Sequence, residues 1–326
     1  MTRPNPVIAE ITRGAIVESF HRGAFAVSDI EGNLVWESGN IAAPVFPRSA
    51  IKAFQCYPLF LTGAAEKFAL TNEEIALCCA SHNAEPEHLQ VASAMLSKAG
   101  CTETDLECGA HWPLDRTAAQ ALVVAGKQPG PLHNCCSGKH AGMLALARHL
   151  GVPIKGYTSA DHPVQKLVGE TVGEIFGVDI ASLPRGIDGC SLPTWAMPLS
   201  NLAHGFAKLA APSSQPGSRI IAAVRHHPFM VAGTGKFDTN IMQAIPRLFI
   251  KFGAEGVFCG TIAHAGLGFA LKCDDGSARA VEVAVARMLG KLSCWTADET
   301  AHLEKFARHD LANWMKFQVG EVRANF

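Results

Sequence analysis

The order of strand and helix signals along the chain constrains its fold more than any other feature. Apolar runs typical of strands occupy residues 7–36, and short glycine-bounded runs of the same kind return after about residue 220. The region between them carries helical spacing. Strands and helices therefore do not alternate regularly, which argues against a doubly wound parallel sheet. The pattern predicts an α+β fold in which both chain ends build an antiparallel sheet flanked by helices, around an inserted, mostly helical domain.

Local signals predict individual elements. Residues 24–28 and 34–37 flank Asp29-Ile-Glu-Gly-Asn33, a typical hairpin turn. The almost uncharged run from Ser49 to Leu61 predicts a buried helix, and Thr71-Asn-Glu-Glu74 is a capping box before another. Further helices are predicted over 85–99, 138–150, 163–176, 278–292 and 297–306, and late strands over 229–232, 248–251, 256–259 and 267–272.

These elements predict two domains. Residues 1–62 and 200–326 form the sheet with its helices, residues 63–199 form the helical domain, and the active site lies between them. A chain of 326 residues is long enough to bury roughly 75% of the surface that it exposes when extended.

Composition excludes several classes of protein. Charged residues make up 17% of the chain and hydrophobic residues 48%, which argues against disorder. The 28 Lys and Arg balance 29 Asp and Glu, so global charge does not favour nucleic-acid binding. No run of 18 apolar residues predicts a membrane span, and Met1-Thr-Arg-Pro-Asn-Pro6 lacks the apolar core of a signal peptide. We expect a cytoplasmic protein that binds neither membranes nor nucleic acid, with reduced cysteines.

The S-x-x-K motif Ser49-Ala-Ile-Lys52 is the first candidate for chemistry. Residues three apart share a helix face, so the lysine amine can reach the serine hydroxyl. Apolar surroundings disfavour the charged form of the amine, and a neutral amine can take the serine proton. The motif alone is weak, because a helix N-cap followed by a surface lysine has the same sequence. Its place at the start of an uncharged helix favours the catalytic interpretation.

Two later segments fit the same plan. Ser81-His-Asn83 follows a predicted helix, and Lys251-Phe-Gly253 closes a predicted strand. Penicillin-binding proteins and serine β-lactamases carry S-x-x-K, a polar motif and K-T-G in this order. K-x-G is common, and an edge-strand lysine remains the alternative for Lys251.

A third segment offers metal-binding side chains. Cys136-Ser-Gly-Lys139 and Asp188-Gly-Cys190 both lie in loops rich in glycine and proline. Two thiolates and a neutral lysine amine can hold zinc with a water in the fourth position. Buried thiols with no metal are the alternative.

Motifs throughout the chain resemble those of the Rhizobium-type L-asparaginases, the asparaginase II family. The most specific is Asn134-Cys-Cys-Ser-Gly-Lys-His-Ala-Gly-Met143. The others are Pro47-Arg-Ser-Ala-Ile-Lys52, Cys79-Ala-Ser-His-Asn83, Gly186-Ile-Asp-Gly-Cys-Ser191, Ala232-Gly-Thr-Gly235, Gly253-Ala-Glu-Gly-Val257 and Gly266-Leu-Gly-Phe-Ala-Leu-Lys-Cys-Asp-Asp-Gly276. The resemblance implies a fold similar to serine β-lactamases and glutaminases, a homodimer, and hydrolysis of asparagine to aspartate and ammonia.

The resemblance also implies residue roles. Ser49 with Lys52, and Ser81 with Lys251, would form two Ser–Lys tandems. The implied zinc ligands are Cys136, Lys139 and Cys190, and the implied substrate-pocket residues are Arg48, His140 and Asp188. Lys236 and Lys272 lie in neighbouring motifs and are alternatives to Lys251. An arginine commonly stands in the family where this chain has Lys236.

The expected mechanism is attack by Ser49 on the side-chain amide, with Lys52 as base and an acyl-enzyme intermediate. Ser81 is the alternative nucleophile. We expect zinc to order the pocket loops rather than to activate the amide or water. Two other functions stay open: a β-lactam or peptide hydrolase of the S-x-x-K type, and a non-catalytic binding protein stabilised by zinc. The sequence does not decide whether glutamine is also a substrate.

Overall fold

The computed structural model describes residues 4–326 and divides into two compact units. The first unit comprises the chain up to Ala50, Met197–Ala210 and Asn240–Phe326, and the second comprises Ile51–Ala196 and Ala211–Thr239. Residues 51–62 and 211–239 thus belong to the helical unit, although the sequence analysis assigns them to the sheet domain. Their helices explain this, because α1 (Lys52–Cys56) packs on α8 (Pro163–Phe176), and α10 (Gln215–His226) packs on α4 (Asn72–Cys78).

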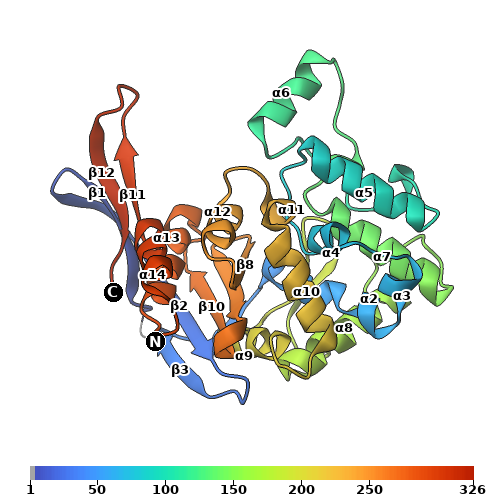
Figure 1. Cartoon of the computed structure of the whole chain (residues 1–326), viewed down its shortest axis with the longest axis horizontal. Coiled ribbons are helices and arrows are strands. Elements are labelled where there is room, and N and C mark those ends of the chain that lie inside the picture. Colours follow the sequence, from blue (N-terminus) through green and yellow to red (C-terminus); the bar gives the residue numbers. More distant parts are fainter. Residues whose placement is uncertain (1–3) are drawn as a thin grey trace. The chain divides into compact units, whose positions relative to one another are not determined.

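The first unit is built on an antiparallel sheet in the order β11-β12-β1-β2-β10-β9-β8, with β3 paired to β2 (Figure 1). The N-terminal strands β1 and β2 lie side by side between strands from the C-terminal part of the chain, since β1 pairs with β12 and β2 with β10. The α+β class and the sheet built from both chain ends are therefore confirmed. The strands are β1 (Val7–Arg13), β2 (Ile16–Ser28), β3 (Leu34–Ser38), β8 (Leu248–Gly253), β9 (Val257–Ile262), β10 (Leu267–Cys273), β11 (Arg308–Ala312) and β12 (Gln318–Ala324).

Helices pack on this sheet. The helix α9 (Leu199–Leu209) packs on β10, β2 and β9, and α13 (Ala278–Gly290) packs on β12, β1 and β10. Their apolar faces and the buried faces of the strands form the core of the first unit. The remaining elements are α14 (Ala297–Phe306), the 3₁₀ turns η1 (Arg48–Ile51) and η4 (Ala263–Ala265), the strand pair β4 (Pro44–Val45) and β7 (Met197–Pro198), and α12 (Phe237–Ala244), which begins in the second unit.

The second unit is mostly helical, and α7 (Ser137–Leu150) lies at its centre. Residues 137–147 of α7 are all buried, because α1, α4, α8 and three further helices surround it. Those three are α2 (Pro58–Leu61), α3 (Ala64–Lys67) and α5 (Pro86–Lys98). The unit also contains α6 (Arg116–Val124), α11 (Pro228–Ala232), the 3₁₀ turns η2 (Glu103–Asp105) and η3 (Pro131–His133), and the strand pair β5 (Arg185–Ile187) and β6 (Pro193–Trp195).

Several local predictions are confirmed. The hairpin of β2 and β3 has Val27 opposite Trp36, and the turn between them is Asp29–Asn33. At the start of α4, the Thr71 hydroxyl accepts the Glu74 backbone N–H at 3.3 Å, and the Glu74 carboxylate accepts the Thr71 N–H at 2.7 Å.

Three predictions need correction. The run from Ser49 to Leu61 is not one helix but η1, α1 and α2, and Pro58 starts α2 because it has no N–H to continue α1. Residues 229–232 are not a strand but part of α11, which begins at Pro228 and packs on α4 and α10. The sequence analysis also missed β11 and β12, whose residues are mostly exposed or half-buried and carry charges such as Arg308 and Glu321.

Among residues 4–326, no helix combines the length and apolar character that crossing a bilayer requires.

Candidate active site

Lys52 is the buried lysine at the centre of the second unit's polar cluster. It begins α1, and none of its surface is exposed. Its Nζ donates to the Ser81 hydroxyl at 2.9 Å and to the Ala80 carbonyl, and lies 3.2 Å from Cys136 Sγ. A buried amine is expensive unless its N–H groups are satisfied, and these three acceptors satisfy them.

Backbone and side-chain hydrogen bonds hold the loop that carries Ser81. The Ser81 N–H donates to the Val231 carbonyl at 2.9 Å, and the His82 N–H donates to the Cys135 carbonyl at 3.1 Å. The His82 ring is hydrogen-bonded to the Ser137 hydroxyl at 2.9 Å. Ser81 is half-buried, and its hydroxyl accepts from Lys52.

The thiol cluster surrounds the start of α7. Cys136 Sγ lies 3.8 Å from Cys135 Sγ, and Lys139 Nζ donates to Cys190 Sγ at 3.2 Å. Hydrogen bonds from the Cys135 and Cys190 thiols hold the pKa of Cys136 well below its usual value, and the Lys52 and Lys139 charges add to this effect. The neighbouring Cys136 and burial raise the pKa of Cys135 and Cys190, so Cys136 is the most readily deprotonated of the three thiols.

The charge of Lys139 follows from the same contacts. Burial lowers the pKa of its ammonium, but the sulfurs of Cys190 and Cys136 outweigh burial and the net shift is upward. Two sulfurs and one amine converge here, which is a donor set that suits zinc. A metal bound to all three would take the place of a proton on the Lys139 amine.

The first unit contains Arg48, Ser49 and Lys251. Arg48 has a φ of 52°, a left-handed conformation that costs a non-glycine residue about 1–3 kcal/mol and is frequent at functional sites. Ser49 follows it in η1 and is half-buried. Lys251 is buried in β8, opposite Cys259, and its Nζ donates to the Phe252 carbonyl at 2.7 Å.

The glycine of the K-x-G motif brings this strand against the loop that carries Ser49. A Cβ atom on Gly253 would lie 2.3 Å from the Pro47 carbonyl oxygen and 3.1 Å from the Ala50 nitrogen. Only glycine permits this approach of two backbones. Within the first unit, the motifs Pro47-Arg-Ser-Ala50 and Lys251-Phe-Gly253 are therefore neighbours.

The lysine hydrogen-bonded to Ser81 in the structure is not the one that the sequence analysis pairs with it. That analysis pairs Ser81 with Lys251, which belongs to the other unit, whereas within its own unit Ser81 is hydrogen-bonded to Lys52.

A model of the L-asparaginase II family matches residues 9–324, almost the whole chain. The chain belongs to the L-asparaginase II family. Membership identifies it as a hydrolase of the amidohydrolase class. A comparison with curated proteins found no match.

Solved structures similar to this L-asparaginase II family member include a β-lactamase from Mycobacterium bovis, with 14% identity over 87% of this chain and 94% of that chain and a TM-score of 0.40. D-alanine carboxypeptidase AmpC from Burkholderia cenocepacia is 11% identical over 83% of this chain and 93% of that chain, with a TM-score of 0.41. Simvastatin synthase from Aspergillus terreus is 12% identical over 77% and 86%, with a TM-score of 0.37. Similarity at this level does not identify an activity.

His140 has a partner that the sequence analysis missed. Its Nδ1 lies 2.7 Å from the Tyr157 hydroxyl, which accepts the Glu107 backbone N–H at 2.9 Å. A hydroxyl oxygen that accepts from Glu107 can still either donate to Nδ1 or accept from it. We assign the hydroxyl as the donor to Nδ1, so that the His140 ring carries its own proton on Nε2. That Nε2 is buried and has no protein partner among residues 4–326.

Burial keeps the His140 ring neutral and lowers its pKa to about 3. The ring is thus a fixed donor at neutral pH. The composition could have pointed to Tyr157, because this chain has 17 phenylalanines and only two tyrosines. A buried tyrosine in such a chain points to a use for its hydroxyl.

His82 and His88 were also missed. The two rings stack with centroids 5.1 Å apart, and His88 stacks on Phe229 at 4.6 Å. Burial lowers the pKa of both rings. Through His82, this stack connects the Ser81 loop to His88 of α5 and Phe229 of α11.

Asp188 lies in the turn between β5 and β6. It is half-buried, and its carboxylate accepts the Gly189 N–H at 2.8 Å, while its backbone N–H donates to the Leu192 carbonyl at 2.8 Å. The same turn carries Cys190, so a predicted substrate-pocket residue and a predicted zinc ligand come from one tight turn.

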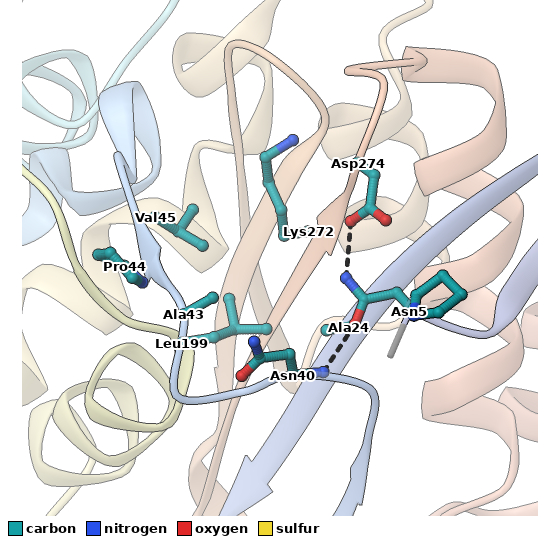
Figure 2. A pocket seen from close by; sticks show the side chains of 10 residues that line it. Asn5, Ala24, Asn40, Ala43, Pro44, Val45, Leu199, Lys272 and Asp274 are labelled. Carbon is teal, nitrogen blue, oxygen red and sulfur yellow. Dashed lines mark hydrogen bonds between the residues drawn. The ribbon is translucent and has the colours of Figure 1, made fainter. Parts of the chain in front are cut away.

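The first unit also has a cavity of about 430 Å³, which is lined by none of the predicted site residues except Lys272, the alternative to Lys251. Figure 2 shows Asn5 inside it, where the side-chain amide donates to the Asp274 carboxylate at 2.8 Å and accepts the Asn40 N–H at 2.7 Å. Lys272 lines this cavity and donates to the Glu255 carbonyl at 2.7 Å. The Asn5 amide therefore ties the N-terminal segment to the sheet.

Proposed function

We propose that this protein is an L-asparagine amidohydrolase that produces L-aspartate and ammonia through a serine acyl-enzyme. The observation that carries the proposal is the buried Lys52 amine, hydrogen-bonded to the half-buried Ser81 hydroxyl in a member of the L-asparaginase II family. A serine hydroxyl is a weak nucleophile until an adjacent base takes its proton.

In the proposed reaction, Ser49 Oγ attacks the side-chain amide carbon of asparagine while the Lys52 amine takes the hydroxyl proton. The C–N bond then breaks, and the departing nitrogen receives a proton through Ser81 and leaves as ammonia. A water molecule hydrolyses the resulting β-aspartyl ester and restores the serine. Lys251 is the proposed partner of Ser81 in this relay.

Ser81 is the second candidate for the nucleophile, and its own contact with Lys52 favours it. The two assignments make different predictions for a trapped ester. Brief reaction with asparagine followed by acid quenching and mass spectrometry of peptides locates the β-aspartyl group on the peptide of Ser49 or on that of Ser81.

Three further residues are proposed to hold the substrate. Asp188 would pair with the α-ammonium group, and Arg48 offers a bidentate fork for the α-carboxylate. The buried His140 Nε2–H, which has no protein partner within residues 4–326, would donate to a substrate oxygen.

Zinc is the proposed metal, held by Cys136, Lys139 and Cys190. The contacts of Lys139 with Cys190 and of the two sulfurs with each other support this donor set. When bound, zinc would fix the start of α7 to the β5–β6 turn and so order the residues beside it. A homodimer, which the resemblance implies, is also a proposal, and light scattering would test it.

The deciding experiment measures ammonia release from L-asparagine, with L-glutamine in parallel, on folded protein of known zinc content. Ser49→Ala and Ser81→Ala should each lower the rate by about 10²-fold or more. Ser97→Ala on the exposed side of α5 is the matched control and should act like the wild type. Absence of ammonia from folded, zinc-loaded protein would refute the proposed function.

A further inference from the structure

We propose that His21, Cys273 and Asp275 form a second metal site, in the first unit, for a divalent cation of the Zn²⁺ type. Their candidate ligand atoms all lie within 4.8 Å of one another. His21 Nδ1 is 2.6 Å from one carboxylate oxygen of Asp275, and Cys273 Sγ is 3.0 Å from the other. This site is independent of the proposed hydrolysis.

Strand register brings the first two ligands together. Cys273, at the end of β10, is opposite Gly23 of β2, and His21 lies two residues before Gly23. Side chains two residues apart share a face of a strand, so His21 and Cys273 are diagonal neighbours on one face. Glycine suits the position between them, because a Cβ on Gly23 would lie 2.3 Å from the Lys272 carbonyl oxygen and 3.3 Å from the Cys273 Cα.

The third ligand comes from the turn that follows β10. One Asp275 carboxylate oxygen accepts the Ser277 backbone N–H at 3.1 Å, which fixes the side chain just before α13. His21 and Cys273 are buried, whereas 52% of the Asp275 side chain is exposed. The two strand residues therefore hold their ligand atoms in fixed positions. The exposed Asp275 carboxylate lets a cation enter from solvent and can shift to bind it.

The chemistry of the three donors matches the cation. Imidazole nitrogen, thiolate sulfur and carboxylate oxygen are all zinc ligands, and three protein ligands leave the fourth tetrahedral position to water. Binding would release the Cys273 thiol proton to solvent, while the neutral His21 ring would bind through Nδ1 and carry its proton on Nε2. The thiolate and the carboxylate together would balance the charge of the cation.

Tetrahedral zinc separates its ligand atoms by roughly 3–4 Å, given metal–ligand distances of about 2.0–2.3 Å. The present spacing between His21 Nδ1 and the Asp275 carboxylate is 2.6 Å, so the carboxylate must withdraw by roughly 0.5–1 Å as the cation enters. Because that side chain is half exposed, the adjustment requires no movement of the core. A bound cation would then join β2, β10 and the turn before α13.

The test must separate this site from the zinc site proposed in the second unit. The double variant Cys136→Ser/Cys190→Ser removes both thiolates of that other site and serves as the background. Metal is stripped with a chelator, the protein is dialysed against buffered Zn²⁺, and zinc per chain is counted by emission spectrometry. We expect one zinc per chain in the background and none after addition of Asp275→Asn, whose amide keeps an oxygen that can accept from Ser277.

Cys294→Ser in the same background is the control, since Cys294 is a half-buried thiol of the first unit outside the trio. It should retain the zinc. Co²⁺ gives a second readout, because a thiolate-to-cobalt charge-transfer band should appear in the background protein and vanish with Asp275→Asn. A background protein that binds no zinc, or an Asp275→Asn protein that keeps it, would overturn the proposal.

If the double variant does not fold, the single Asp275→Asn change in the otherwise unaltered protein decides. It should lower bound zinc by one equivalent per chain, and an unchanged count would overturn the proposal. Ammonia release is measured on the same samples. Loss of zinc with asparagine turnover retained would support this site while leaving the proposed function intact.

Discussion

Replacing Tyr157 by phenylalanine tests how His140 is held. The side chain is fully buried, and its hydroxyl makes two hydrogen bonds, at 2.7 Å to His140 Nδ1 and at 2.9 Å from the Glu107 N–H. Phenylalanine keeps the ring and removes both bonds. Each buried polar group left without a partner costs about 1–3 kcal/mol, so the two together should lower the free energy of unfolding by about 2–6 kcal/mol.

The same change should disturb the His140 tautomer. Without the hydroxyl donor, Nδ1 no longer has a proton aimed at it, and the ring is free to carry its own proton on either nitrogen. Histidine ¹⁵N chemical shifts distinguish the two tautomers directly. If Nε2–H donates to the substrate as proposed, kcat/KM should fall, by up to about 10²–10³-fold for complete loss of that donor.

The only other tyrosine in the chain is the matched control. Tyr57 belongs to the same unit and its hydroxyl is hydrogen-bonded to the Ser214 hydroxyl at 2.7 Å. Tyr57→Phe should cost about 1 kcal/mol and leave His140 unchanged, because it removes a single, partly buried hydrogen bond that does not involve His140. Equal losses of stability for the two variants, together with an unchanged His140 spectrum in Tyr157→Phe, would refute the reasoning.

Three other changes test the remaining structural arguments. Lys52→Met should lower asparagine turnover by about 10²–10⁴-fold, because it removes the proposed base, and ammonia release measures this; a rate within threefold of wild type would contradict the assignment. Gly253→Ala should destabilise the protein by about 2 kcal/mol or more, since the added carbon would lie 2.3 Å from the Pro47 carbonyl oxygen, and urea unfolding measures the loss. The Arg247 guanidinium, with Thr296, lowers the pKa of Glu299 to about 2, below its usual 4.5, so this ion pair contributes stability above pH 4.5 that is lost as the pH falls toward 2. Glu299→Gln should therefore cost about 1–3 kcal/mol at pH 7 and little near pH 2, and a difference that does not depend on pH would exclude the ion pair as its cause.

The sequence predicted those parts of the molecule that depend on short-range patterns. The hairpin of β2 and β3, the capping box of α4 and the sheet from both chain ends all follow from local turn, capping and spacing signals. The approach of Lys52 to Ser81 was not predicted as a direct pair. It depends on the packing of α1 against α4, which no local pattern encodes.

The missed features share a physical cause. The strands β11 and β12 hold few buried residues, so their pattern lacks the apolar alternation on which a strand prediction depends. The apolar run at 229–232 looks the same whether it is a buried strand or a short buried helix, and Pro228 decides in favour of the helix. Tyr157 was missed because its partner His140 is 17 residues away and the contact requires a fold.

Lys52 joins the serine and the thiol cluster into one network, which changes how metal-site variants must be interpreted. Cys136→Ser and Cys190→Ser should both lose the proposed zinc, but only Cys136→Ser also removes the sulfur 3.2 Å from Lys52 Nζ. If zinc alone supports turnover, the two variants should lose the same activity at matched zinc content. If the Cys136 thiolate also positions the Lys52 amine toward serine, Cys136→Ser should lose more than Cys190→Ser when both proteins are metal-free. Equal rates in the two metal-free proteins would show that Cys136 does not position Lys52. Metal binding would then be its only contribution to turnover.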